Sequence, residues 1–274
     1  MTDFSRYKSR FPDAREDLDH IRHVPRTSQT ESPSYRLAFS DTDFLARDEL
    51  RPVRLQLELL KPELTLAERG IQSTIAMLGS ARIPDPASSE PPRNDRIANL
   101  GTYYEEARAF ARLTTERAVA SGNRENVVCT GGGPGVMEAG NRGARDAGGI
   151  SISLNIVLPA EQAPNRYATP DLSFNFHYFA IRKMHFLMRA RAIAVFPGGF
   201  GTFDELFEVL TLIQTRRMAP LPILMFGRAF WENVINWDGL VAAGTVEAED
   251  IDLFRYVDSP VEAWACIDAF DLAA

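Results

Sequence analysis

The residues with the clearest chemical potential lie in the segment FPGGFGTFDELFE, residues 196–208. Three glycines, a threonine and the acids Asp204 and Glu205 follow an apolar run, AIAVF, and precede a helical pattern. Glycine permits sharp turns and close approach of backbone N–H groups to a ligand, and a helix start favours an anion. The segment predicts either a tight loop alone, or an anion site at residues 197–202 with Glu205 as a reactive carboxylate. The helix dipole would stabilise Glu205 in both cases.

A second glycine-rich segment, TGGGPG at residues 130–135, follows the apolar run ENVVCT and opens another helical pattern. Its candidate anion-binding residues are Gly132 and Gly133. The segment lacks the dinucleotide fingerprint, because the third glycine would have to be Val136 or Glu138. It is not a P-loop either, since no Gly-Lys pair occurs in the chain. A tight turn and a phosphate site both remain open for this segment.

Two adjacent basic residues, Arg182 and Lys183, lie in the predicted helix HYFAIRKMHF, just before the strand that leads to the first segment. Adjacent helical residues are about 100° apart, so both need not face one site. A guanidinium beside a phosphate loop can bind an anion with two hydrogen bonds or orient a carboxylate. Arg182 is therefore a candidate partner of Glu205.

The elements that must position these residues alternate between strand and helix from residue 73 onward. This alternation predicts an α/β fold, a Rossmann-like doubly wound parallel sheet, as one domain over residues 73–274. Ligands bind such sheets at the carboxyl ends of the strands, where both glycine segments fall. We expect strands over residues 73–78, 125–130, 150–158, 192–197, 221–226 and 254–257, and helices over 96–122, 136–148, 177–190, 202–217 and 259–270.

Residues 1–72 are predicted to form a mainly helical N-terminal extension, a flexible arm followed by short helices. The apolar side chains in its second half share one helical face (Leu50, Val53, Leu57 and Leu60). Pro52 and Pro62 should bound or break a helix, so we expect more than one short piece. The extension is expected to pack against the main domain or a second subunit.

Composition excludes several classes of protein. The 274 residues are 45% hydrophobic and 24% charged, which is ordinary for a globular protein, and the net charge of -7 argues against a nucleic-acid partner. No apolar stretch approaches a membrane span and no secretory leader is evident, so we expect a cytoplasmic protein that does not bind membranes. Cys129 and Cys266 cannot form a disulfide framework or a zinc site, and Cys129 is predicted to be a core residue.

The segments GGGPGVMEAGNRGA, IRKMHF and PGGFGTFDE resemble the signature set of the LONELY GUY family of phosphoribohydrolases, whose members were often labelled lysine decarboxylases. The resemblance covers roughly residue 73 to the C-terminus, and the N-terminal extension is similar to that of the longer bacterial branch. Arg182 and Lys183 match the Arg-Lys pair of the family. The family pattern P-G-G-x-G-T-x-x-E is matched without a departure by Pro197, Gly198, Gly199, Gly201, Thr202 and Glu205.

The resemblance implies hydrolysis of the N-glycosidic bond of a nucleoside 5′-monophosphate, which gives free base and ribose 5-phosphate. Cytokinin riboside monophosphates and AMP are the substrates it implies, and cytokinin biosynthesis the process. Arg182 and Glu205 would be the catalytic pair and residues 197–202 the phosphate-binding loop. The resemblance also implies a homodimer or higher homo-oligomer and a nucleotide contact from Glu161. No cofactor and no metal are expected.

Two further positions could lie near the substrate. Asn165 lies with Glu161 in the segment after the third strand, and Thr211 comes two helical turns after Glu205 and could close the pocket. A role only in loop or helix structure is equally compatible with the pattern. The group that protonates the leaving base is not assigned, and the sequence does not specify the base.

Three alternatives to the hydrolase differ in chemistry. A pyridoxal-phosphate-dependent lysine decarboxylase would need a Schiff-base lysine, for which Lys183 is the only nearby candidate among three lysines. A non-catalytic nucleotide or molybdenum-cofactor carrier would share the fold and the phosphate loops. A nucleotide-responsive regulator would bind without turnover. Arg182 together with Glu205 favours the enzyme, because a binder of phosphate does not need a carboxylate there.

Overall fold

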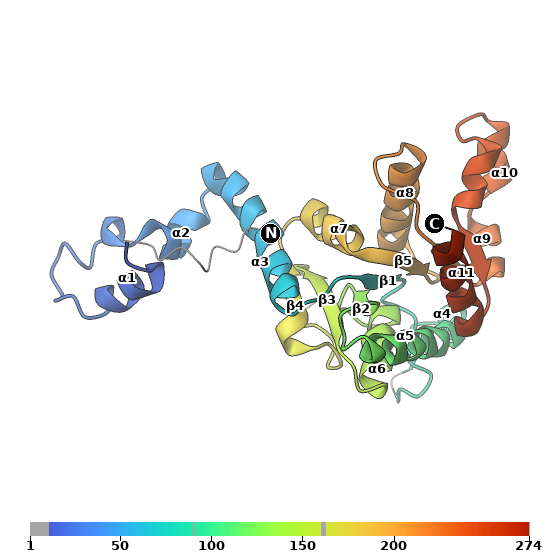
Figure 1. Cartoon of the computed structure of the whole chain (residues 1–274), viewed down its shortest axis with the longest axis horizontal. Helices are drawn as coiled ribbons and strands as arrows, with labels where there is room; N and C mark the ends of the chain where they lie inside the picture. Colours follow the sequence, from blue (N-terminus) through green and yellow to red (C-terminus); the bar gives the residue numbers. More distant parts are fainter. Residues whose placement is uncertain (1–10, 90, 160–162, 274) are drawn as a thin grey trace. The chain divides into compact units, whose positions relative to one another are not determined.

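The computed structural model describes residues 11–89, 91–159 and 163–273. The chain divides into two compact units, of which the first ends at Arg54 and the second begins at Leu55. Figure 1 labels their helices and strands. The first contains short elements only, and no residue within them is buried: α1 (Ala14–Ile21), η2 (Pro33–Tyr35), η3 (Ala38–Ser40), α2 (Thr42–Leu45) and η4 (Asp48–Leu50). The helix α3 (Arg51–Glu68) begins in this unit and continues in the second.

The second unit is built on a seven-stranded sheet whose neighbouring strands all pair in parallel. The strand order is β4-β3-β2-β1-β5-β6-β7. The predicted Rossmann-like α/β fold is therefore confirmed. The strands are β1 (Thr74–Leu78), β2 (Val127–Thr130), β3 (Ser151–Ile156), β4 (Ser173–Phe176), β5 (Ala190–Val195), β6 (Ile223–Phe226) and β7 (Arg255–Val257).

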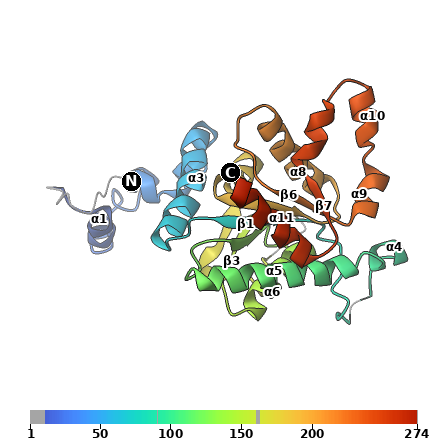
Figure 2. The ribbon, with the colours of Figure 1, turned by 45° about the vertical axis from the view of Figure 1, so that its right-hand side comes forward.

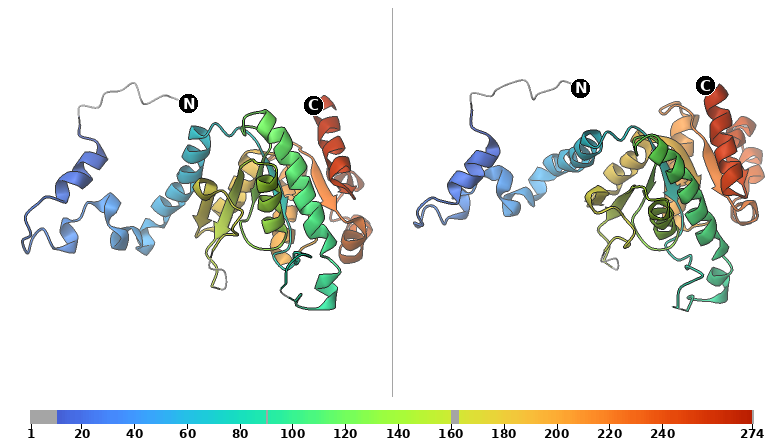
Figure 3. Two further views of the ribbon diagram at one scale, coloured as in Figure 1. Left: turned by 90° about the horizontal axis from the view of Figure 1, so that it is seen from below. Right: turned by 60° about the horizontal axis from the view of Figure 1, so that its bottom comes forward.

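Helices cover both faces of this sheet, which is why the strands are buried along their whole apolar runs. In β1, Ile75 and Met77 join one core and Ala76 and Leu78 the other. One face is covered by α5 (Thr102–Ala120), α6 (Val136–Asp146) and α11 (Pro260–Ala273), which lie close together in Figures 2 and 3. The other face is covered by α7 (Phe179–Met188), α8 (Phe200–Gln214) and α9 (Arg228–Val234).

The strand order reverses direction between β1 and β5, the two neighbours at the centre of the sheet. The chain leaves β1 toward one edge and later returns to the other side of it. A crevice opens at the carboxyl ends of strands at such a point, because the connections after them run to opposite faces. Both glycine segments follow strands beside this crevice, namely β2 and β5.

Several predicted elements need correction. The helix expected over residues 96–122 is two helices, α4 (Asp95–Ala98) and α5, separated at residues 99–101. The strand β4 was not predicted, and neither were α9 and α10 (Trp237–Ala242). All three are short, and their apolar residues are fixed by packing in the tertiary structure more than by a repeating local pattern.

The prediction that Pro62 breaks the helix is wrong, because α3 runs unbroken through it. Proline lacks the N–H that would bond to the carbonyl four residues earlier, which belongs to Glu58. That carbonyl accepts a hydrogen bond from Nε2 of His185 on α7, at 3.2 Å. Tertiary contact thus replaces the missing helical bond.

Two smaller expectations can be compared directly with the structure. Cys129 is buried in the core, as predicted. Every helix within the described ranges is too short or too polar to cross a lipid bilayer.

Candidate active site

A cavity of about 730 Å³ lies where the strand order reverses. It is bordered by the loops that follow β1, β2 and β5 and by the helices α7 and α8. Its polar and backbone lining includes Gly79, Ser80, Arg82, Gly131, Arg182, Pro197, Gly198, Gly199, Gly201, Thr202 and Glu205. Its apolar lining includes Ile97, Leu100, Met137, Ile156, Leu158, Phe179, Phe200, Phe203 and Phe230.

Arg182 and Glu205 meet in this cavity from two different helices. Nη1 of Arg182 lies 3.5 Å from Oε1 of Glu205, and Nε of Arg182 donates a 2.7 Å hydrogen bond to the carbonyl of Leu154 in β3. The whole Arg182 residue is only 9% exposed, and the Glu205 side chain 15%. The guanidinium is therefore held from two sides. Because its contact with Glu205 is long, the guanidinium and the carboxylate can each also bind a ligand.

Burial dominates the ionisation of Glu205. It raises the pKa of this carboxyl from 4.5 to about 7, against the positive charge of Arg182, which lowers it. Asp204 and Glu208 raise the pKa further, and Lys183 lowers it. Both protonation states of Glu205 are consequently accessible near neutral pH, the condition in which a carboxyl group can exchange a proton efficiently.

The second glycine segment forms the start of α8. Gly199 is the N-cap residue and no side chain caps the helix, so the N–H groups of the first turn can bond to an anion. Gly198 is required by close packing, because a Cβ atom there would lie 2.1 Å from Oγ1 of the buried Thr202. The predicted residues of the loop, 197–199 and 201–202, all line the cavity.

The first glycine segment approaches the cavity through Gly131. A Cβ atom on Gly131 would lie 2.4 Å from Nη2 of Arg182, so the missing side chain makes room for the guanidinium. Gly132 and Gly133 are not among the cavity-lining residues. Their carbonyls accept hydrogen bonds from Asn165, whose N–H lies 2.8 Å from the Gly132 oxygen and whose Nδ2 lies 3.1 Å from the Gly133 oxygen. Asn165 thus holds the shape of this loop.

Two other predicted residues, Lys183 and Thr211, are not among those that line the cavity. Lys183 pairs with Asp204 at 3.2 Å and with Glu208 at 3.1 Å. Thr211 donates a 2.7 Å hydrogen bond to the carbonyl of Phe207 and lies on an open groove along α8. Their predicted part in substrate binding stays a prediction, as does that of Glu161, which lies outside the described residues.

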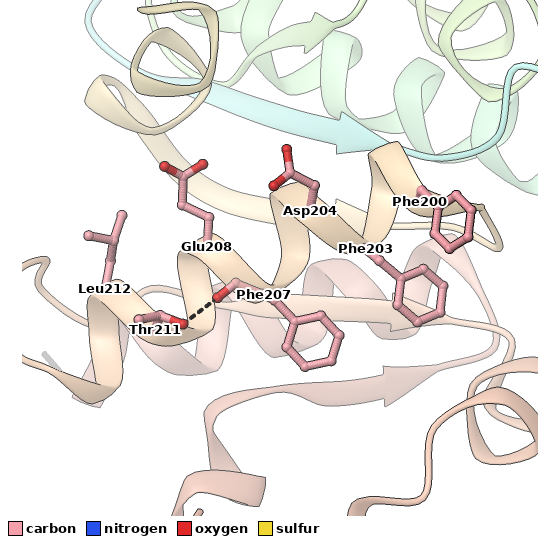
Figure 4. Close-up of a pocket in the computed structure, with 7 residues that line it drawn as sticks. All are labelled: Phe200, Phe203, Asp204, Phe207, Glu208, Thr211 and Leu212. Carbon is pink, nitrogen blue, oxygen red and sulfur yellow. Dashed lines mark hydrogen bonds between the residues drawn. The ribbon is translucent and has the colours of Figure 1, made fainter. Parts of the chain in front are cut away.

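That groove is a second surface feature, with a volume of about 470 Å³. In Figure 4 the rings of Phe203 and Phe207 project from one side of α8, and the carboxylates of Asp204 and Glu208 from another. Phe200 at the start of the helix is 97% exposed. The groove is therefore aromatic, and it adjoins the cavity through Phe200 and Phe203, which line both.

The loop GSAR, residues 79–82, was not predicted as part of the site although it connects both glycine segments. The N–H of Ser80 donates to the Pro197 carbonyl at 3.1 Å, and the Ser80 carbonyl accepts from the N–H of Val136 at 3.1 Å. The Arg82 side chain is exposed at the cavity, and within the described residues it has no hydrogen-bond or ion-pair partner. The signal that could have found this loop is its position, because it directly follows a central buried strand at the same sheet edge.

No group of three or more His, Cys, Asp or Glu side chains in the described part of the chain is arranged to hold a metal ion. The site is made of one carboxyl group, arginines, backbone N–H groups and an apolar wall. Such a set can bind an anion, orient a sugar and move a proton.

Comparison with known proteins finds similarity in sequence. A family model described as "Possible lysine decarboxylase" matches residues 137–267, the part of the chain that contains Arg182, the second glycine segment and Glu205. The match supports the resemblance of this segment to the LONELY GUY family. The "Pyrimidine/purine nucleotide 5'-monophosphate nucleosidase" of Escherichia coli (strain K12) is 31% identical to the chain over 122 residues, which cover 39% of the chain and 25% of the relative. The chain therefore spans a quarter of the length of the curated relatives it matches.

Solved structures resemble the chain at low sequence identity. The molybdenum cofactor binding protein from Rippkaea orientalis is 17% identical, with a TM-score of 0.48 over 73% of this chain and 97% of that one. The molybdenum cofactor carrier protein from Chlamydomonas reinhardtii is 17% identical, with a TM-score of 0.43 over 74% and 99% of the two chains.

Proposed function

We propose that the chain hydrolyses the N-glycosidic bond of a nucleoside 5′-monophosphate, giving the free base and ribose 5-phosphate. The observation that carries this proposal is the buried pair of Arg182 and Glu205 beside the uncapped start of α8, inside one cavity. The similarity of 122 residues of the chain to a nucleotide 5′-monophosphate nucleosidase supports it.

In this proposal the 5′-phosphate binds at the first turn of α8, where N–H groups and the helix dipole favour an anion. Arg82, with an unpaired guanidinium at the cavity, supplies a cation for the phosphate. Phosphate binding far from the reacting bond fixes the anomeric carbon against Glu205, and such positioning lowers the barrier of the chemical step.

The reaction breaks the bond between C1′ and the base nitrogen, and the electron pair leaves with the base. The ribose passes through an oxocarbenium-like centre, which the ionised carboxylate of Glu205 stabilises. Water adds its oxygen to C1′, Glu205 takes a proton from that water, and the leaving base gains one proton overall. Arg182 keeps enough of Glu205 ionised for this role, because its charge opposes the effect of burial on the pKa.

The apolar wall of the cavity suits the face of a planar base. Phe179, Phe203, Phe230 and Leu158 line it, and aromatic rings stack on bases without selecting one by hydrogen bonds. We therefore infer a site that accepts more than one base, including the adenine of AMP and the modified adenine of a cytokinin riboside monophosphate.

The chain is further proposed to form a homodimer. The exposed side chains of Phe200 and Phe207 on α8, drawn in Figure 4, and those of Met184 and Met188 on α7 support apolar contact with a second copy of the chain. Sedimentation of the purified protein should give twice the mass of the 30.6 kDa chain, and a monomer would refute this part.

The test separates an enzyme from a carrier. Nucleotide binding and base release are measured in parallel for the unmodified protein, for Glu205→Gln and for the control Glu116→Gln, whose carboxylate pairs with Arg112 on α5 outside the cavity. Glu205→Gln should bind AMP nearly as before and release no adenine, while the control keeps its turnover. Tight binding without turnover by the unmodified protein would favour the carrier.

A further inference from the structure

The N-terminal helix α3 reaches the start of α7, the helix that carries Arg182. The Glu58 carboxylate on α3 accepts hydrogen bonds from the N–H groups of His177 at 2.8 Å and Tyr178 at 3.1 Å. Tyr178 is the N-cap residue of α7 and makes no side-chain cap. Glu58 therefore caps α7 from another helix, and its negative charge lies where the dipole of α7 favours an anion.

A short path of hydrogen bonds leads from this cap to the candidate active site. The N–H of Arg182 donates to the carbonyl of Tyr178 at 3.1 Å, so Arg182 closes the first helical turn that Glu58 caps. The Arg182 guanidinium then contacts Leu154 and Glu205. A change in the Glu58 cap consequently acts on the turn from which the guanidinium extends.

Further contacts hold α3 against the rest of α7. His185 donates from Nε2 to the Glu58 carbonyl, the one that Pro62 leaves without a helical partner. Arg189, which follows α7, pairs with Glu63. Glu58 thus holds the start of α7 through its side-chain carboxylate and the middle of α7 through its backbone carbonyl.

We propose that Glu58 is a positioning residue of the active site, and that residues 55–68 of α3 are part of the apparatus that aims Arg182 at Glu205. The proposal rests on the proposed hydrolase for its kinetic consequences only. It assigns a function to a helix that precedes the glycine and arginine segments and has no residue among those that line the cavity.

The kinetic test compares Glu58→Ala, Glu58→Gln and the control Arg69→Ala. Misplacement of a catalytic group by about 1 Å can cost about 100-fold in rate, so Glu58→Ala should lower kcat by about 10- to 100-fold with little change in KM. Glu58→Gln keeps one acceptor oxygen and should recover part of the loss. Arg69→Ala removes a 2.6 Å ion pair with Asp171 outside the cavity and should keep kcat unchanged.

A second readout does not depend on turnover. Arg182 lowers the pKa of the Glu205 carboxyl, so a displaced guanidinium should leave that pKa higher in Glu58→Ala than in the unmodified protein. NMR titration of the labelled carboxyl measures it, and general loss of stability would not move it in the folded protein. An unchanged pKa together with unchanged kcat overturns the positioning role. If the unmodified protein is inactive and Glu58→Ala still raises the pKa of the Glu205 carboxyl, only the proposed hydrolase is refuted.

Discussion

Replacing Glu205 by glutamine should make the protein more stable at alkaline pH than the unmodified chain. In the folded protein burial raises the pKa of this carboxyl to about 7, against 4.5 as its ordinary value. The folded state therefore binds the proton more tightly than the unfolded state. Stability falls as pH rises through the window from about 4.5 to about 7, because the buried carboxyl must ionise there. Glutamine does not ionise and escapes this loss.

The magnitude follows from the two values. At 1.36 kcal/mol per pKa unit, the difference between about 7 and 4.5 corresponds to about 3 kcal/mol in the free energy of unfolding. Nearly all of it is lost between about pH 4.5 and about pH 7, so Glu205→Gln should gain about 3 kcal/mol relative to the unmodified protein above about pH 7 and little below about pH 4.5. For a domain of this size that equals about 5 to 10 °C in Tm.

Thermal unfolding of both proteins at a series of pH values measures the effect. Subtracting the two melting temperatures at each pH cancels the contributions of the other titrating groups, because both proteins contain them. Glu116→Gln is the matched control, since it deletes an exposed acid that pairs with Arg112 on α5. Parallel pH curves for Glu205→Gln and the unmodified protein would refute a buried, proton-binding Glu205.

Three other substitutions test the geometry of the site. Arg182→Ala should abolish base release and weaken nucleotide binding, and the acid limb of any residual pH–rate profile should move to higher pH; retention of full activity would remove Arg182 from the mechanism. Gly131→Ala should lower kcat by about 100-fold through displacement of the guanidinium, since its Cβ would lie 2.4 Å from Nη2, and circular dichroism checks that the fold persists. Arg82→Ala should raise KM for AMP by about 10-fold, the loss of one charge-assisted hydrogen bond, without changing weak binding of adenosine; equal effects on both ligands would contradict a contact to phosphate.

The sheet and the second glycine loop could be predicted because their signals are local. Alternating apolar runs and helical patterns predict a parallel sheet, and the glycines before Glu205 mark a turn into a helix. The position of Arg182 before the loop made it a candidate partner of Glu205, and the resemblance named the two as a catalytic pair. The two residues are far apart in sequence, and only packing of α7 and α8 on the sheet brings them together.

The remaining features depend on tertiary contacts that no local pattern encodes. Pro62 lies inside a helix because His185 bonds the carbonyl it leaves free, and the sequence shows the proline but not the partner. Lys183 pairs with Asp204 and does not line the cavity, an outcome that its adjacency to Arg182 allowed but did not determine. Arg82 has no glycine-rich run beside it, so only the position of its loop after a central strand could have indicated it.

The most direct test of the central claim is product analysis after incubation of the purified protein with AMP and with a cytokinin riboside monophosphate, without added cofactor, in ¹⁸O-labelled water. The proposed hydrolysis predicts equal amounts of free base and ribose 5-phosphate, with the label on the oxygen at C1 of the earliest product. Recovery of intact nucleotide that remains bound to the protein, with no free base from either compound, would contradict it.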